Sequence, residues 1–122
     1  MQGKPPKKVV WIRSSLEDLK AFPDTVQRHL GFALETAQYG GKHPDAKPLH
    51  GFGGASVVEI VEDYDGDTYR AVYTVKFAEA VYVLHAFQKK AKHGIETPKH
   101  DVDLIKERLR YVTNELHRKT RL

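Results

Sequence analysis

A four-residue turn near the middle of the chain limits the possible folds more than any other feature of the sequence. Residues 64–67 read Tyr-Asp-Gly-Asp, and an Asp-Gly pair between segments of alternating apolar residues is a strong signal for a β-hairpin. Residues 57–62 and 68–77 are the expected strands on either side of it. A further strand is expected over residues 80–88, after a tight connection around Glu79. The sequence therefore predicts three consecutive antiparallel strands.

The N-terminal third of the chain predicts a helical hairpin that follows a short strand over residues 8–13. Ser14 or Ser15 can cap the first helix. Pro23 should begin the second helix, because proline is favoured at the first helical position. Apolar residues recur at helical spacing along this second helix, and the glycine pair at residues 40–41 should end it.

The C-terminal segment predicts one amphipathic helix after a basic loop. Thr97 is expected to cap this helix, with Pro98 as its first residue. Its apolar stripe consists of Val102, Ile105, Leu109, Val112 and Leu116. A loop over residues 42–54 should join the helical hairpin to the strands. The order of strand, two helices, three antiparallel strands and helix predicts a compact α+β fold, in one domain over residues 1–122 with its core at about residues 9–112.

The composition excludes several functional classes. The chain has no cysteine, so it can form no disulfide, no thiolate zinc site and no cysteine nucleophile. Its histidines and carboxylates show no ligand spacing such as HExxH, so neither a metal site nor a cofactor is expected. No apolar segment is long enough to span a membrane, and the expected location is the cytoplasm.

Positive charge is concentrated in the C-terminal third of the chain. The whole sequence has a formal net charge of +4. From Ala80 to the end, ten lysines and arginines face five acidic residues. This distribution favours contact with a polyanion at that end, although a charge of this size does not by itself identify a nucleic-acid-binding protein.

The register of the last two strands determines which side chains share a face of the sheet. If their connection closes about Glu79, Tyr73 lies opposite His85. Alternation then gives one almost wholly apolar face, which should pack on the helices and which holds Tyr73, Val75, Phe77, Val81, Val83, His85 and Phe87. The opposite face carries Arg70, Val72, Thr74, Lys76, Tyr82, Leu84, Ala86 and Gln88, and Lys90 would continue it.

Arg70 is the candidate anion-binding residue on that second face. Its guanidinium offers a planar fork of donors that suits a phosphate and stays charged at any working pH. The alternative is a surface arginine that pairs with an acid such as Glu59 or Glu62. Residues 88–93, Gln-Lys-Lys-Ala-Lys-His, pose the same choice, because they could bind a nucleic-acid backbone or form a solvated loop.

The histidines differ in what their positions predict. His93 and His100 flank the basic loop and the start of the last helix, so either could carry a proton near neutral pH. His85 lies among apolar residues and is expected to be a core histidine with one satisfied ring nitrogen. The remaining four, which share no spacing, are His29, His43, His50 and His117.

Several of these segments, taken together, are similar to one known family. The blocks are Tyr-Arg-Ala-Val-Tyr at residues 69–73, Val-Tyr-Val-Leu-His-Ala-Phe-Gln-Lys-Lys at residues 81–90 and Thr-Pro-Lys-His at residues 97–100, and Pro-Leu-His at residues 48–50 adds to them. In this combination the chain resembles the phage-derived branch of the RelE/HigB toxins, over roughly residues 9–112. The topology predicted above agrees with the fold of that family.

The resemblance implies the toxin of a type II toxin–antitoxin system, a metal-independent endoribonuclease that cuts messenger RNA on the ribosome and leaves a cyclic phosphate. Arg70 would stabilise the charge that develops on the phosphate, with Lys90 as its companion. His93 or His100 would move the protons. The RNA-binding residues would be Lys89, Lys92, Lys99 and Tyr82.

The resemblance also implies partners and leaves alternatives open. The expected partners are a helix-turn-helix antitoxin of the HigA type, the ribosome and messenger RNA. One alternative is a gyrase-inhibiting toxin of the ParE branch, which has the same fold without nuclease chemistry. In that case the helical hairpin over residues 15–39 would matter more than Arg70. The other alternative is a domesticated phage regulatory protein that binds without harming its host.

Overall fold

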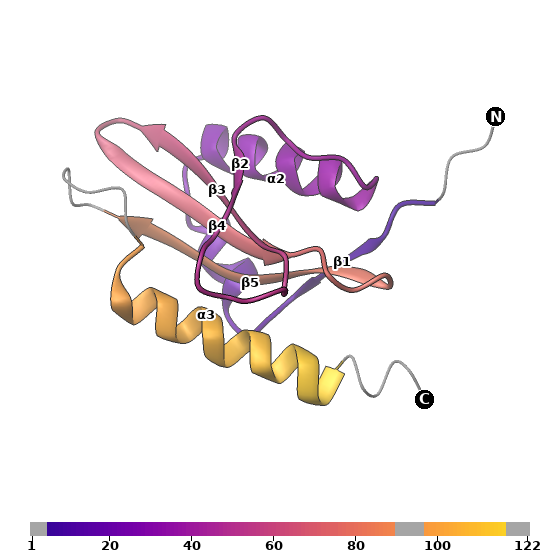
Figure 1. Cartoon of the computed structure of the whole chain (residues 1–122). Helices are drawn as coiled ribbons and strands as arrows, with labels where there is room; N and C mark the ends of the chain where they lie inside the picture. Colours follow the sequence, from indigo (N-terminus) through magenta and orange to yellow (C-terminus); the bar gives the residue numbers. More distant parts are fainter. Residues whose placement is uncertain (1–4, 90–96, 117–122) are drawn as a thin grey trace.

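The computed structural model describes residues 5–89 and 97–116, which form a five-stranded sheet with helices on both faces (Figure 1). The strands are β1 (Lys8–Trp11), β2 (Ala46–Pro48), β3 (Val57–Tyr64), β4 (Asp67–Thr74) and β5 (Ala80–Lys89), in the spatial order β1-β5-β4-β3-β2. The helices are α1 (Ser15–Lys20), α2 (Asp24–Gln38) and α3 (Lys99–Tyr111), which continues into a π-helical turn, Val112–Leu116. The predicted α+β class is confirmed.

The β3–β4 hairpin forms at the predicted turn. Asp65 and Gly66 both have positive φ, at 53° and 86°, and Tyr64 pairs with Asp67 across the turn. This two-residue turn accommodates the right-handed twist of the strands, which is why an Asp-Gly pair favours it. β5 then pairs antiparallel with β4, and β1 adds to the other side of β5 as a parallel strand.

The loop predicted over residues 42–54 contains a strand that the sequence did not reveal. Residues of β2 pair antiparallel with β3, with Ala46 opposite Ile60 and Pro48 opposite Val58. Ala46 is buried, whereas the other two residues of β2 are exposed. The strand lies at the edge of the sheet, where a proline is tolerated because it needs no inter-strand donor there. A three-residue strand with one buried side chain leaves no detectable alternation.

The predicted register between β4 and β5 is wrong by two residues at Tyr73, and a β-bulge in β5 follows directly. Tyr73 pairs with Val83, while the preceding residue, Val72, pairs with His85, so Leu84 is an extra residue on β5. An extra residue reverses the facing of every side chain that follows it. His85 and Phe87 therefore lie on the face of Arg70, opposite to the prediction. Gln88 moves to the other face, opposite Tyr69.

The sheet separates two hydrophobic cores. On the side of α1 and α2, the apolar stripe of α2 is fully or almost fully buried, as its helical spacing predicted. This core contains Leu19, Phe22, Val26, Leu30, Ala33, Leu34, Ala37, Ile60, Tyr69, Ala71, Tyr73, Val81, Val83 and Ala86. On the side of α3 the core contains Ile12, Ala55, Val57, Val72, Phe77, Ala80, Tyr82, Leu84, Ile105 and Val112. No helix in residues 5–89 or 97–116 is both long and apolar enough to cross a bilayer.

A buried polar network attaches α3 to the bulge of β5. The Arg108 guanidinium donates to the main-chain carbonyl of Leu84 at 3.0 Å and lies 3.2 Å from Nδ1 of His85. Nε2 of His85 lies 2.7 Å from a carboxylate oxygen of Asp101. Because Arg108 can only donate, Nδ1 of His85 must accept a hydrogen bond from it. Nε2 therefore carries the ring proton and donates a hydrogen bond to the Asp101 carboxylate. His85 is buried, as predicted, and both of its ring nitrogens have partners.

This network predicts a pH dependence of folding stability. Burial, aided by Arg108, lowers the pKa of His85 below its ordinary value of 6.5, although Asp101 opposes the shift. The unfolded chain therefore takes up this proton at a higher pH than the folded chain. The stability contributed by neutral His85 is complete above the ordinary pKa and is lost as the pH falls toward the lower folded-state pKa.

Urea unfolding of the wild type, His85→Gln and His50→Gln between pH 7.5 and pH 5 measures this contribution. We expect the free energy of unfolding to change with pH by the same amount in the wild type and in His50→Gln, in which an exposed histidine is lost. His85→Gln should have a shallower slope below the ordinary histidine pKa, whatever its stability at pH 7.5. Identical slopes in all three proteins would contradict the assignment.

Candidate functional site

Arg70 lies on the face of β4 that α3 covers, and its charge is paired. Its guanidinium lies 3.2 Å from a carboxylate oxygen of Glu59 on β3. The same oxygen accepts a hydrogen bond of 2.9 Å from the hydroxyl of Thr97. The Arg70 and Glu59 side chains are only 5% and 12% exposed. Arg70 is thus not on a solvated face, and the alternative in which an acid pairs with it is confirmed for Glu59.

This arrangement also corrects the predicted start of the last helix. Pro98 occupies the cap position of α3, with its carbonyl accepting from the amide of Val102, and no side chain caps the helix. Thr97 uses its hydroxyl on Glu59 instead. The residue that the sequence identified as a helix cap is therefore a link between α3 and the sheet.

The surroundings of Arg70 combine an aromatic stack with a basic strand end. Phe87 of β5 lies directly opposite Arg70 in the sheet, and His85 stacks on Phe87 with ring centroids 4.8 Å apart and planes 18° from parallel. Lys89 ends β5 opposite Thr68 and lies on the same face as Arg70 and Phe87. Thr97, which precedes α3, is bound beside them through Glu59.

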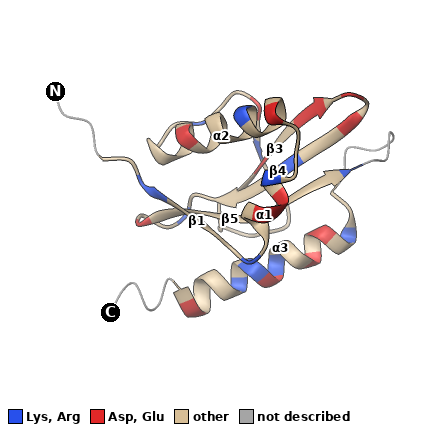
Figure 2. Cartoon of the chain, turned by 180° about the vertical axis from the view of Figure 1, so that it is seen from behind, with Lys and Arg blue, Asp and Glu red and all other residues tan. Residues whose placement is uncertain are grey.

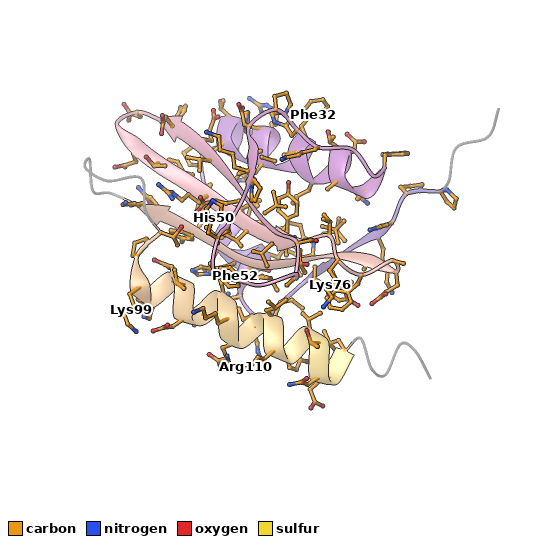
Figure 3. The ribbon with its side chains drawn as sticks, in the orientation of Figure 1. Phe32, His50, Phe52, Lys76, Lys99 and Arg110 are labelled. Carbon is orange, nitrogen blue, oxygen red and sulfur yellow. The ribbon has the colours of Figure 1, made fainter. Side chains whose placement is uncertain are left out.

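The remaining site residues fall into three groups. Lys99 and His100 are exposed at the start of α3, where Lys99 forms an ion pair of 2.9 Å with Asp103 and projects away from the sheet (Figure 3). Tyr82 is buried near the other end of β5, where its hydroxyl donates to Glu79, so the structure does not bring it to Arg70. The candidates outside the described residues are Lys90, Lys92 and His93.

The charge around Arg70 is mixed rather than uniformly positive. Acidic residues crowd the far end of the β3–β4 hairpin, and basic and acidic residues alternate along α3 (Figure 2). A hollow of about 420 Å³ lies beside the free part of the β3 edge, lined by Asp45, Lys47, Glu59, Val61, Glu62 and Asp63. Glu59 thus reaches both Arg70 and this hollow. A phosphate that binds Arg70 would compete with the Glu59 carboxylate for the same guanidinium.

Two groups of side chains near the sheet were not expected from the sequence to act together. One is the buried triad of Asp101, His85 and Arg108, which exists only because the bulge turns His85 toward α3. The other joins His29 of α2 with His43 and Asp45 of the segment before β2, and their ligand-type atoms all lie within 4.8 Å of one another. Of the described residues, these three form the group that could hold a metal ion, and no sequence spacing indicated it.

The comparisons with known proteins assign the chain to a family. The sequence matches the phage-derived Gp49-like proteins (DUF891) over residues 17–110, most of its length, so the chain belongs to this family. Among solved structures, it is similar to the toxin–antitoxin complex RelBE2 from Mycobacterium tuberculosis, with 19% identity and a TM-score of 0.43, over 74% of this chain and 100% of that one. No curated protein matches the sequence. Membership of a phage-derived family, which the sequence blocks predicted, is confirmed by the family match.

The buried pair predicts an unequal response to two substitutions of acids. Glu59→Leu leaves the Arg70 charge buried without its carboxylate, and we expect the free energy of unfolding to fall by about 3 kcal/mol. The matched control is Asp103→Asn, which breaks the exposed pair with Lys99 and should change stability little, because solvent screens such pairs. Urea unfolding at neutral pH measures both, and equal small effects would contradict the paired state of Arg70.

Proposed function

We propose that this member of the Gp49-like family is the toxin of a toxin–antitoxin pair and acts as a ribosome-dependent messenger-RNA endoribonuclease. Its family membership and the sequence blocks shared with the RelE/HigB toxins support the proposal. The reaction class needs no metal. The 2′-hydroxyl of one nucleotide attacks the adjacent phosphorus, the bond from phosphorus to the 5′-oxygen breaks, and the products carry a 2′,3′-cyclic phosphate and a 5′-hydroxyl.

The observation that carries this proposal is the position of Arg70 close to both Lys89, where β5 ends, and Thr97, which precedes α3. β5 ends at Lys89 on the face of Arg70, and the chain returns at Thr97, whose hydroxyl binds the Glu59 partner of Arg70. The residues proposed to act with Arg70, which include Lys90, Lys92 and His93, belong to the segment between these two ends. An arginine that lies near the residues on either side of a basic segment suits a phosphate-binding role.

In the proposed mechanism, Arg70 exchanges one anion for another. In the free protein the Glu59 carboxylate neutralises the guanidinium. On the ribosome the scissile phosphate takes that position, and Arg70 then stabilises the additional negative charge of the phosphorane. The guanidinium is paired before and after the exchange, and the displaced Glu59 carboxylate, which also lines the hollow beside β3, turns toward solvent there.

The remaining roles fall to residues around the ends of the same segment. Lys90 adds positive charge at the phosphate, and His93 or His100 accepts the hydroxyl proton and supplies a proton to the leaving 5′-oxygen. His100 is exposed and therefore accessible to RNA. Lys89, Lys92 and Lys99 contact the RNA backbone, whereas Tyr82 would need α3 to move before it could reach RNA, since it is 2% exposed. Positioning of the message by the ribosome supplies a further part of the rate.

The proposed partner is a helix-turn-helix antitoxin of the HigA type, and the proposed location is the cytoplasm. A basic C-terminal third suits an acidic antitoxin segment. The antitoxin either covers Arg70 and the basic segment that follows β5, or binds on the side of the α1–α2 hairpin. The first arrangement silences the toxin by direct occlusion of the site.

The nuclease proposal predicts that messenger-RNA cleavage depends on the Arg70 charge and not on the stability of the fold. Because Arg70→Ala alone would leave Glu59 buried and unpaired, the test uses the double variant Arg70→Met with Glu59→Leu. Replacing a buried ion pair by apolar side chains is often neutral for stability. We expect cleavage by this variant in a translating extract, followed by primer extension, to fall by at least about 100-fold.

Two further variants make this test decisive. Arg110→Ala removes an exposed arginine from the outer surface of α3 and should cleave like the wild type (Figure 3). His100→Gln should reduce cleavage if this histidine moves a proton, with little loss of RNA binding. A folded double variant that cleaves as fast as the wild type would overturn the role of Arg70. Growth arrest by the wild type without any cut in the messages would overturn the nuclease itself.

A second candidate function, a gyrase-inhibiting toxin without nuclease chemistry, is favoured by one observation. Phe32 and Tyr39 on and next to α2 are 60% and 65% exposed, and Phe32 projects from the side of the molecule away from α3 (Figure 3). Large exposed aromatic side chains are typical of protein-binding surfaces. In this function the α1–α2 hairpin would contact the target and Arg70 would serve only the fold.

The two functions predict opposite effects of Phe32→Ser with Tyr39→Ser in cells. A gyrase inhibitor should lose growth arrest with this variant and keep it with the Arg70→Met, Glu59→Leu variant. A ribonuclease should show the reverse. Tyr64→Ser, which removes the other exposed large aromatic residue among those described, is the matched control. Correct folding of the wild type without growth arrest would instead support the domesticated regulatory protein.

A further inference from the structure

We propose that His29, His43 and Asp45 form a binding site for a transition-metal ion of the zinc class, on the opposite side of the sheet from the Arg70 site. Nε2 of His29 lies 3.3 Å from a carboxylate oxygen of Asp45. Two ligands of a tetrahedral zinc site, each about 2.1 Å from the ion, are about 3.4 Å apart. His43 completes the group, and one ligand-type atom from each residue lies within 4.8 Å of the others.

The His29 ring is oriented as a metal-binding histidine would be. Nε2 is buried and makes no hydrogen bond with any residue in the described parts of the chain, although Asp45 is close. Nδ1 lies 3.3 Å from a carboxylate oxygen of Glu62 on β3. Metal-bound histidines almost always donate their second ring nitrogen to a carboxylate or carbonyl, which fixes the tautomer. A proton on Nδ1 that faces Glu62 leaves Nε2 with an unused lone pair directed at the site.

The His43 ring is held in place by its own neighbours. Its Nδ1 accepts a hydrogen bond of 3.1 Å from the main-chain amide of Asp45. The ring packs edge to face against His29, with centroids 5.1 Å apart, and against Phe32, with centroids 5.7 Å apart. The side chain is 11% exposed. The two aromatic contacts restrict the ring, so it loses little conformational freedom when a metal binds. The ion has to replace the hydrogen bond from the Asp45 amide, because a neutral imidazole has one unprotonated nitrogen.

The electrostatic surroundings favour a cation. Asp45 and Glu62 also line the hollow beside the β3 edge, together with Glu59, Asp63 and a single lysine, Lys47. Of the three proposed ligands, Asp45 lines this hollow. Two imidazoles with one carboxylate suit zinc, copper or nickel, whereas calcium and magnesium prefer oxygen ligands alone. With three protein ligands, the fourth position remains for water or a partner's side chain.

Metal binding would join elements that are distant in sequence. His29 belongs to α2, His43 and Asp45 lie just before the edge strand β2, and Glu62 belongs to β3. An ion held by these residues would fix β2 and α2 to the sheet and stabilise the folded chain over the unfolded one. The site shares no residue with the Arg70 pair, so it stands independently of the nuclease proposal.

The test measures zinc binding and folding stability of the full chain without a histidine tag. We expect isothermal titration with zinc chloride to show one site per chain, and equimolar zinc to raise the midpoint of thermal unfolding. His29→Gln and Asp45→Asn should abolish both effects, and Glu62→Gln should weaken binding by about 10–100-fold. His50→Gln, an exposed histidine near β2, is the matched control and should bind like the wild type. A tenfold excess of magnesium should not compete.

The cobalt-substituted protein gives a second readout that does not depend on stability. Tetrahedral coordination by two histidines and one carboxylate should produce visible absorption that is lost in His43→Gln. If the wild type does not bind zinc at millimolar concentration, the proposal is wrong. Binding that survives in both His29→Gln and Asp45→Asn would also overturn it, because the ion would then lie at other residues.

Discussion

The β-bulge at Leu84 is the feature on which most of this structure depends. One extra residue on β5 turns the side chains of His85 and Phe87 to the face that α3 covers. The same irregularity leaves the Leu84 carbonyl in need of a donor, which Arg108 of α3 supplies. The helix is therefore attached to the sheet where the ladder is irregular. The position of α3 in turn places Thr97 against the Glu59 partner of Arg70.

Much of the fold could be predicted because its signals are local. The Asp-Gly turn, the apolar stripes of two helices and the glycines after α2 depend on a few neighbouring residues each. The bulge could not be predicted, because Val83, Leu84, His85 and Ala86 are all compatible with either face. The edge strand β2 could not be predicted for a related reason. Its pairing with β3 depends on the burial of Ala46 and not on an alternating pattern of apolar residues.

In the candidate sites, the sequence indicates the residue types that carry chemistry but not which of them lie together in space. Arg70 could be singled out because an arginine within a strand needs an anion, and the pairing with an acid was one of the two predicted outcomes. That Thr97 shares the carboxylate of Glu59 required the position of α3, which no sequence pattern provides. His29, His43 and Asp45 have no common spacing, and only the return of the chain through β2 brings them together. A local motif such as HExxH places its ligands on one helix, whereas this group combines α2 with the segment before β2.

The energetics of the Arg70 pair bear on its role. Removing both charges from water costs several kcal/mol for each ion, about as much as their attraction returns, so two apolar side chains would serve the fold equally well. The stability of the domain thus gives no reason for a guanidinium at this position. A requirement to bind an anion does, because the guanidinium can exchange the Glu59 carboxylate for a phosphate while Glu59 turns toward the hollow that it also lines. The Thr97 hydroxyl, which binds the same carboxylate oxygen, connects such an exchange to the start of α3.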